Sequence, residues 1–168
     1  MRAIEVPEFG ENDVLATAER DVPEPGSGEV RIAVEAVGVN FADVMQRRGH
    51  YPGGPQPLSV PRLEAARTTD AVGEGVDRAV GDRVVAMTNR SYAEYTTASA
   101  DALFDVPEGM SFEEAAGFPV QFLTAHNTLF EWGGLESGEK VLIHAAAGGV
   151  GTAATQLASR AGAEVFGT

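Results

Sequence analysis

Hydrophobic and polar residues alternate in short runs through the first part of the chain. Met1–Val6 is one such run, and in another Val30, Ile32 and Val34 alternate with polar residues. Alternation with a period of two is typical of strands with one buried face, and prolines and glycines separate the runs. The sequence therefore predicts a β-rich module here. Further predicted β runs are Val14–Glu19, Ala71–Val76, Arg83–Met87 and Ser91–Thr97.

Two stretches interrupt this β pattern. Asn40–Arg48 loses the alternation and is predicted to form a short helix. His50–Pro61 is rich in proline and glycine and is predicted to be a loop. Loops of this length inside compact domains are often functional, so residues at either end of this loop are candidates for a site.

After Pro107 the pattern becomes helical. Ser111 followed by Glu114 forms a capping box, and the helical pattern continues to Trp132. We place a domain boundary in this region and expect one domain over 1–118 and a second over 119–168. Five aromatic residues recur near helical spacing and are interpreted as core: Phe112, Phe118, Phe122, Phe130 and Trp132.

The last stretch of the chain, Lys140–Thr168, is predicted to form strand, turn, helix and strand. The first strand covers Val141–His144, and Glu164–Gly167 forms the second. The helix between them begins near Val150 and ends at Gly162, which suits a left-handed cap. Its apolar stripe has the spacing of a buried helix face and comprises Val150, Ala153, Ala154, Leu157, Ala158 and Ala161.

The turn before this helix is a candidate dinucleotide site. Its spacing is Ala146-x-Gly148-x-x-Gly151, the dinucleotide pattern with alanine for its first glycine, and Gly149 and Val150 complete it. Glycine permits positive φ and a close approach of phosphate to backbone N–H groups, and the helix N-terminus attracts an anion. A tight connection without a ligand is the alternative, but the strand–turn–helix–strand context favours binding.

Composition narrows the function classes. The net charge is -13, which argues against a nucleic-acid partner. With no cysteine there is no thiolate metal ligand, and the three histidines lack the spacing of a metal set. Nothing resembles a signal peptide or apolar span, so we expect a soluble cytoplasmic protein without a membrane partner. Scattered acidic residues with Lys140 as the one lysine predict an acidic, salt-adapted (halophilic) surface.

Several segments together resemble the medium-chain dehydrogenase/reductase superfamily, most closely its zinc-free, zeta-crystallin-like quinone oxidoreductases. The segments that carry the resemblance run along nearly the whole chain. They are Ala36–Asp43, Gly49–Pro52, Val80–Val84, Ser91–Tyr95, Glu114–Ala116, Phe118-Pro119, Thr124-Ala125 and Ala145–Gly151.

This resemblance implies an α/β fold in which a GroES-like β-rich catalytic domain precedes the opening βαβ of a Rossmann domain. It also implies hydride transfer from NADPH to a quinone or an α,β-unsaturated carbonyl (enone). By family analogy Asn40 and Tyr51 lie near nicotinamide or substrate, Asp43 supports that loop, and Thr124 lies against the nicotinamide. Zinc-dependent relatives carry a cysteine ligand near Asn40, and its absence argues against a metal.

Simpler interpretations of these residues remain open. Asn40 and Asp43 are residue types that often cap a short helix. Tyr51, in its proline-rich loop, is as much a packing candidate as a contact for substrate. Thr168 lies near the point where an acidic residue would bind the ribose of NAD, and its lack of charge favours NADPH.

The sequence also departs from the resemblance. Family members usually have glycine where this chain has Arg62 and Arg67, and arginine would be strained if either position needs positive φ; surface changes are the simpler interpretation. The family's chains run to about twice this length, so we expect truncation after the second Rossmann strand. A non-catalytic remnant is the alternative to an enzyme, and a homodimer or a separately encoded, trans-completing second half is an expected partner.

Overall fold

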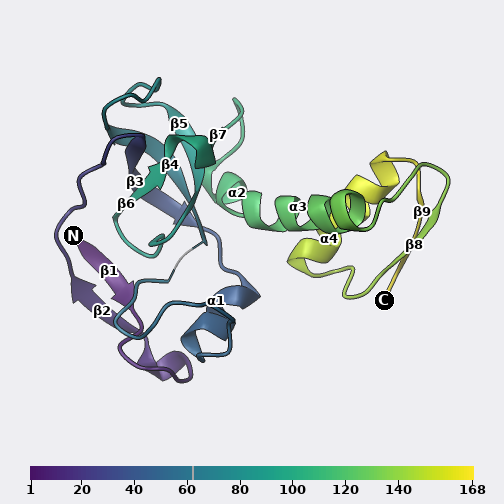
Figure 1. The fold of residues 1–168 in the computed structure, drawn as a ribbon, viewed down its shortest axis with the longest axis horizontal. Coiled ribbons are helices and arrows are strands. Elements are labelled where there is room, and N and C mark those ends of the chain that lie inside the picture. Colours follow the sequence, from purple (N-terminus) through teal and green to yellow (C-terminus); the bar gives the residue numbers. More distant parts are fainter. Residues whose placement is uncertain (62) are drawn as a thin grey trace. The chain divides into compact units, whose positions relative to one another are not determined.

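The computed structural model describes residues 1–61 and 63–168 and divides into two compact units (Figure 1). Met1–Gly117 is called the amino-terminal unit and Phe118–Thr168 the carboxy-terminal unit. The predicted α/β fold class is confirmed, with an antiparallel sheet in the first unit and a parallel strand pair in the second. The sequence-based division into a catalytic domain over 1–118 and a cofactor domain over 119–168 stays a prediction.

A five-stranded antiparallel sheet, in the order β6-β3-β4-β5-β7, forms the centre of the amino-terminal unit. The alternation seen in the sequence buries Val30 and Ile32 of β3 against Val84 and Ala86 of β5. The register of β3 against β4 shifts between Val34 and Ala36, which is typical of a bulge that curls a sheet. The strands are β3 (Glu29–Val37), β4 (Leu63–Val72), β5 (Arg83–Thr88), β6 (Tyr95–Ser99) and β7 (Leu103–Asp105).

The predicted run Ala71–Val76 marks only the end of a longer strand, since β4 begins at Leu63. Charged residues inside β4, among them Glu64 and Asp70, broke the alternation on which the prediction depended. The predicted run Ser91–Thr97 likewise overlaps only the start of β6.

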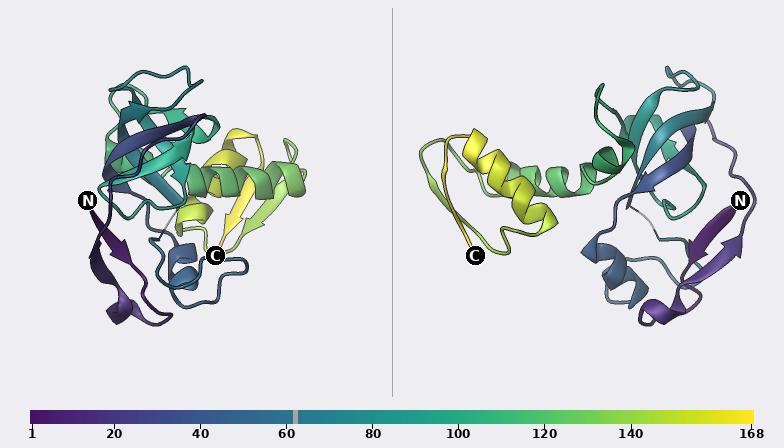
Figure 2. Two further views of the ribbon diagram at one scale, coloured as in Figure 1. Left: turned by 60° about the vertical axis from the view of Figure 1, so that its left-hand side comes forward. Right: turned by 180° about the vertical axis from the view of Figure 1, so that it is seen from behind.

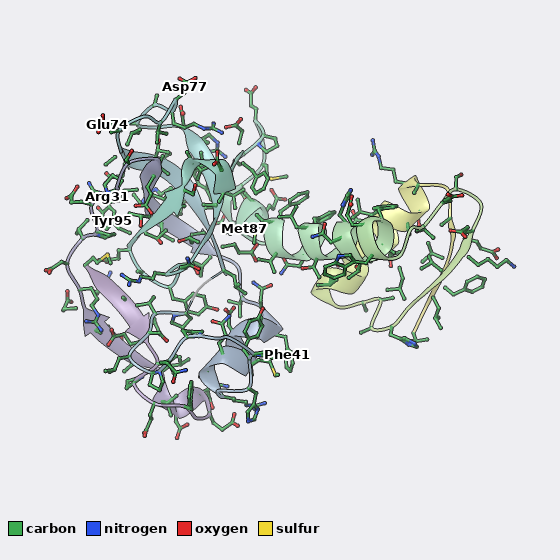
Figure 3. All side chains as sticks on the ribbon, in the orientation of Figure 1. Arg31, Phe41, Glu74, Asp77, Met87 and Tyr95 are labelled. Atoms are coloured by element: carbon green, nitrogen blue, oxygen red, sulfur yellow. The ribbon has the colours of Figure 1, made fainter. Side chains whose placement is uncertain are left out.

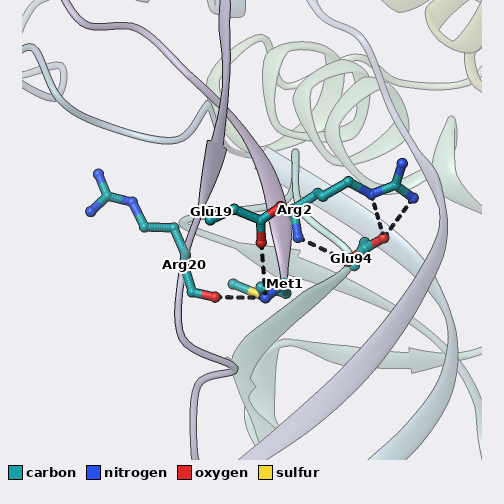
Figure 4. A network of polar contacts seen from close by, with 5 residues as sticks. All are labelled: Met1, Arg2, Glu19, Arg20 and Glu94. Atoms are coloured by element: carbon teal, nitrogen blue, oxygen red, sulfur yellow. Dashed lines mark hydrogen bonds and ion pairs between the residues drawn. The ribbon is translucent and has the colours of Figure 1, made fainter.

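A hairpin of β1 (Arg2–Glu5) and β2 (Ala16–Glu19) lies beside this sheet. Its end is held by polar contacts (Figure 4), in which the terminal ammonium of Met1 donates to the carbonyl oxygen of Arg20 at 2.6 Å. The Arg2 guanidinium donates to Glu94 Oε1 at 2.7 Å, which joins the hairpin to the segment that precedes β6. The same unit contains α1 (Phe41–Arg47), α2 (Phe112–Ala116) and the short 3-10 turns Asn12–Val14 and Ala100–Ala102.

The helical pattern after Ser111 is confirmed, but it covers three elements and not one. The capping box is present, with Glu114 N–H donating to Ser111 Oγ at 3.2 Å. α2 ends before Gly117, and α3 (Pro119–His126) starts again at a proline, which suits a first helical position. The segment Asn127–Trp132 then widens into a π-helix.

In the carboxy-terminal unit, β8 (Lys140–Ile143) and β9 (Glu164–Gly167) form a parallel pair, and α4 (Gly149–Arg160) connects them along the chain. This confirms the predicted strand–turn–helix–strand order, and the chain can be followed through these elements by colour in Figure 2. Phe122 and Phe130 pack against the core of this unit. Phe118 and Trp132 are 44% and 78% exposed, so their interpretation as core is wrong.

Candidate functional site

Asn40 and Asp43 lie at the start of α1. Asn40 is the N-cap residue, with φ -118° and ψ 152°, and its backbone N–H donates to Asp43 Oδ2 at 2.8 Å. This is the reciprocal half of a capping box, so the capping interpretation of Asp43 is confirmed. The cap also fixes the backbone of Asn40. Asn40 itself is only 9% exposed. Its neighbour Phe41 is exposed and points away from the body of the unit (Figure 3).

Glu64 on β4 lies next to Asn40 and was not predicted from the sequence as a site residue. Its Oε1 accepts a hydrogen bond from Asn40 Nδ2 at 2.9 Å, and the residue is completely buried. A Cβ at Gly38 would lie 2.0 Å from the same oxygen, so glycine at that position makes the room for the carboxylate. The available signal was a charged residue between apolar ones in Leu63-Glu64-Ala65.

Tyr92 holds Asp43 from the other side. Its hydroxyl donates to Asp43 Oδ2 at 3.2 Å. Burial raises the pKa of the Asp43 carboxyl, while the hydrogen bonds from the Asn40 N–H and the Tyr92 hydroxyl act to lower it. Burial also raises the pKa of the Tyr92 phenol, and the nearby Asp43 and Glu64 carboxylates raise it further. We call Asn40, Asp43, Glu64 and Tyr92 the Asn40 network.

The raised pKa of Tyr92 predicts a loss of stability at alkaline pH. The unfolded chain releases this proton near the ordinary value of 10.0, whereas the folded protein retains it. The contribution of Tyr92 to the free energy of unfolding is therefore fully present below that pH and is lost as the pH rises above it. We expect the loss to be less than about 1 kcal/mol per pH unit, because the phenol is only partly buried. Urea unfolding at a series of alkaline pH values measures this slope.

The matched variant is Tyr92→Phe, which keeps the ring and removes the titrating proton. We expect a flatter alkaline slope for this variant than for the unchanged protein. Tyr95→Phe serves as the control, since Tyr95 lies on β6 beside Arg31, whose Cζ is 5.8 Å from the ring centroid (Figure 3). Equal slopes for the protein and Tyr92→Phe would contradict the assignment.

Tyr51 is placed differently from Asn40 and Asp43. It is 39% exposed in the loop between α1 and β4, where its carbonyl oxygen accepts from the Gly54 N–H at 2.9 Å. It lies outside the hydrogen bonds that join the Asn40 network. Its contact with substrate or nicotinamide stays a prediction.

The glycine-rich turn of the carboxy-terminal unit differs in detail from its prediction. The residue with positive φ is Ala145, at 52°, whereas Gly148 has φ -77°. Gly151 is needed for close approach, because a Cβ there would lie 2.1 Å from the Ala145 oxygen and 2.7 Å from Ala146 Cα. Glycine at this position therefore lets the helix begin directly against the turn.

The N-terminus of α4 has the features of an anion site. The first N–H groups of a helix have no partner inside it, and Gly148, the N-cap, has no side chain to cap them. Gly148 and Gly149 are exposed. The Gly148 N–H already donates to the Ala145 carbonyl oxygen at 2.9 Å, so the donors for an anion are the N–H groups of the residues that follow it in the first turn of α4. Val150 is 38% exposed, which corrects its assignment to the buried stripe; Ala153, Ala154 and Ala158 are buried as predicted.

α3 lies beside this turn within the same unit. A Cβ at Gly149 would lie 3.2 Å from Gln121 Cγ. Thr124, three residues further along α3, is exposed and shares that side of the helix. A dinucleotide is therefore compatible with the residues present, which are Thr124, Ala146, Gly148, Gly149, Val150 and Gly151.

The carboxyl ends of the two parallel strands meet at the same place. His144 Nδ1 lies 3.1 Å from Thr168 Oγ1, and the Ala146 N–H donates to the Thr168 carbonyl oxygen at 3.1 Å. In doubly wound sheets, ligands bind outside this end of the strands. Thr168 therefore lies at this end of the strands, and the preference for NADPH inferred from its lack of charge stays a prediction.

Arg67 is unstrained. It lies within β4, paired with Val34 and Val84, and its guanidinium Nε is 3.2 Å from Glu35 Oε2 at the surface. The concern that arginine here would need positive φ is wrong, because the backbone is an ordinary strand. Arg62 lies outside the described residues.

Over residues 1–61 and 63–168, no three or more acidic, histidine or cysteine side chains are grouped to hold a metal ion. Within those same ranges, no helix has the length and apolar character needed to cross a membrane.

Comparison with known proteins places these features in context. Residues 26–108 match the family model of the alcohol dehydrogenase GroES-like domain. The synaptic vesicle membrane protein VAT-1 homolog-like of Mus musculus is 40% identical over 171 residues, a match that covers 100% of this chain and 41% of that protein. The chain therefore spans less than half the length of this relative.

Solved structures match across both units. The CurK enoyl reductase is 38% identical, with a TM-score of 0.93 over 99% of this chain and 53% of its own. A mycobacterial protein complexed with NADPH is 42% identical, with a TM-score of 0.92 over 99% of this chain and 52% of its own.

Proposed function

We propose that the chain is an oxidoreductase of the medium-chain dehydrogenase/reductase superfamily, which its match to the alcohol dehydrogenase GroES-like domain and its 40% identity to a relative support. The reaction is transfer of hydride from NADPH to a quinone or an α,β-unsaturated carbonyl, without a metal. The observation that carries the proposal is the turn at Ala145–Gly151, where α4 begins without a side-chain cap directly after a parallel strand. Similarity to an enoyl reductase and to an NADPH complex supports the choice of reaction and cofactor.

The carboxy-terminal unit supplies the cofactor contacts. The N–H groups at the start of α4 donate to a pyrophosphate, and the helix dipole adds to this attraction. Thr124, exposed on α3, lies on the side of the turn where the nicotinamide end is bound in this proposal. A nicotinamide cofactor, when bound, supplies the hydride.

The amino-terminal unit supplies the polar contacts for the substrate. Hydride adds to the β-carbon of the conjugated carbonyl, and negative charge develops on the carbonyl oxygen. Asn40 carries an amide that can donate to this oxygen, and Tyr51 contributes a second donor from its loop. A preorganised donor of this kind stabilises the transition state because it needs no reorientation during the reaction.

The test is steady-state oxidation of NADPH by the full chain, with a small quinone and an enone as acceptors. We expect turnover that chelators do not lower, transfer of a single C4 hydrogen of NADPH, and a weaker response to NADH. Asn40→Ala is expected to lower kcat by about a hundredfold. Asn12→Ala, in a 3-10 turn far along the chain from Asn40, is the matched control.

Two results would contradict the proposal. Failure of the full chain to bind NADPH would remove the cofactor assignment. Binding of NADPH without turnover of either acceptor would remove the reaction. Equal kcat for Asn40→Ala and the unchanged chain would leave the reaction but exclude Asn40 from it.

A further inference from the structure

The structure holds Asn40 at two points. Its backbone N–H donates to Asp43 Oδ2 at 2.8 Å, and its side-chain Nδ2 donates to Glu64 Oε1 at 2.9 Å. Asp43 is in turn held by the Tyr92 hydroxyl at 3.2 Å. The contacts come from three separate segments of the chain, and Asp43, Glu64 and Asn40 are each at least nine-tenths buried.

Stability alone does not account for a carboxylate at position 64. Glu64 is completely buried in β4 between apolar neighbours, and burying a charged group costs free energy that an apolar residue would not incur. The fold also leaves out a side chain at Gly38, since a Cβ there would lie 2.5 Å from the Glu64 carboxyl carbon. The residues at positions 38 and 64 together therefore place a hydrogen-bond acceptor next to the Asn40 amide.

An acceptor of this type determines which way the amide of Asn40 faces. Glu64 Oε1 acts as an acceptor, whereas an amide has a donor end and an acceptor end. Glu64 must therefore meet the Nδ2 end, and rotation of the amide by half a turn would place two acceptors against each other. A glutamine in the same place would accept either orientation.

We propose that Glu64 and Tyr92 are positioning residues: Glu64 sets the orientation of the Asn40 amide, and Tyr92, through Asp43, sets its backbone. The proposal deepens the proposed function, on which it rests, because Asn40 is the donor to the substrate oxygen there. The substrate group recognised is accordingly a carbonyl oxygen that gains negative charge. It meets the Asn40 amide, whose orientation the protein has already fixed.

The experiment compares the full chain with Glu64→Gln and Tyr92→Phe. Glu64→Gln keeps the size of the side chain and removes its preference for the donor end of the amide. We expect kcat to fall about tenfold in each variant, with KM for NADPH unchanged. Removing a partner that only orients another group typically lowers activity by about this factor. The controls are Glu5→Gln, another buried carboxylate, and Tyr95→Phe, which are expected to retain kcat.

A second readout does not depend on activity. The side-chain amide protons of Asn40, identified by NMR from their loss in Asn40→Asp, are expected to move in Glu64→Gln and to stay in place in Glu5→Gln. An unmoved resonance in a folded Glu64→Gln variant would overturn the proposal, as would an unchanged kcat in both variants of an active protein.

These readouts separate the two ideas. If the unchanged chain does not oxidise NADPH, the proposed function fails, and the amide resonance still decides whether Glu64 orients Asn40. If Glu64→Gln does not fold, Tyr92→Phe decides the proposal through kcat and through the shift of the Asn40 backbone amide.

Discussion

Replacing Gly151 with alanine is expected to abolish tight NADPH binding and to destabilise the carboxy-terminal unit. The new Cβ would lie 2.1 Å from the Ala145 oxygen and 2.9 Å from the Ala145 carbonyl carbon, and both belong to backbone that cannot move aside cheaply. Ala145 already adopts φ 52°, so the turn has little freedom to adjust. We expect a loss of about 3 kcal/mol in the stability of this unit.

Two measurements check this expectation. Fluorescence titration with NADPH is expected to show affinity lowered at least about a hundredfold, because the N–H groups at the start of α4 no longer converge. Hydrogen exchange in residues 118–168 reports the local loss of stability.

Gly149→Ala is the matched comparison for stability. Its Cβ would meet a flexible side-chain atom, Gln121 Cγ, at 3.2 Å, so the neighbour needs to give by only a few tenths of an ångström. We expect its unfolding free energy to change by less than about 1 kcal/mol. Wild-type protection from exchange in Gly151→Ala would show that the turn tolerates a side chain.

Replacing Gly38 with alanine is expected to destabilise the amino-terminal unit strongly. Its Cβ would lie 2.0 Å from Glu64 Oε1 and 2.5 Å from the carbonyl oxygen of Ala116, so both a buried carboxylate and the end of α2 would have to move. Glu64 has no exposed surface toward which it can turn. We expect a loss of about 3 kcal/mol or more, which lowers the thermal midpoint by roughly 10 °C.

Thermal unfolding and the Asn40 amide resonance both measure this change. Gly28→Ala is the control for the loss of glycine without crowding. A Cβ at Gly28 meets nothing within 4 Å, but its φ of 78° disfavours a side chain. It isolates the conformational cost of losing glycine, expected to be about 1 kcal/mol. A midpoint for Gly38→Ala equal to that of Gly28→Ala would contradict the proposed crowding of Glu64.

Much of the fold was predictable because the relevant signals are local. Alternation in Glu29–Val37, the capping box of Ser111 with Glu114, and the glycine turn before α4 each depend on residues a few positions apart. The confirmed strands and helices come from such patterns. The first part of β4 was missed because Glu64 and Arg67 interrupt the alternation. Both charged side chains are explained by contacts with other segments, since Glu64 bonds Asn40 and Arg67 pairs with Glu35.

The candidate site was predictable only in part. Asn40 and Asp43 were found through the segment Ala36–Asp43, and their mutual contact is a local one over three residues. Glu64 and Tyr92 were missed because their contacts join residues 24 and 49 positions apart. No periodicity in the chain records such contacts, since they depend on the pairing of β3 with β4 and on the path of the Ser91–Tyr95 segment.

The sequence by itself determined the β-rich first unit, the order strand–turn–helix–strand in Lys140–Thr168, and the glycine pattern that marks a dinucleotide turn. Local preference sufficed there, because each element is defined by the spacing of its own residues. Only the tertiary structure decided that Ala145 takes the positive φ of that turn, that Gly151 is required by backbone contact, and that a buried carboxylate lies under Asn40. The physical reason is that close approach and buried polar contacts depend on how distant segments pack, and a side chain's burial is set by its neighbours in space.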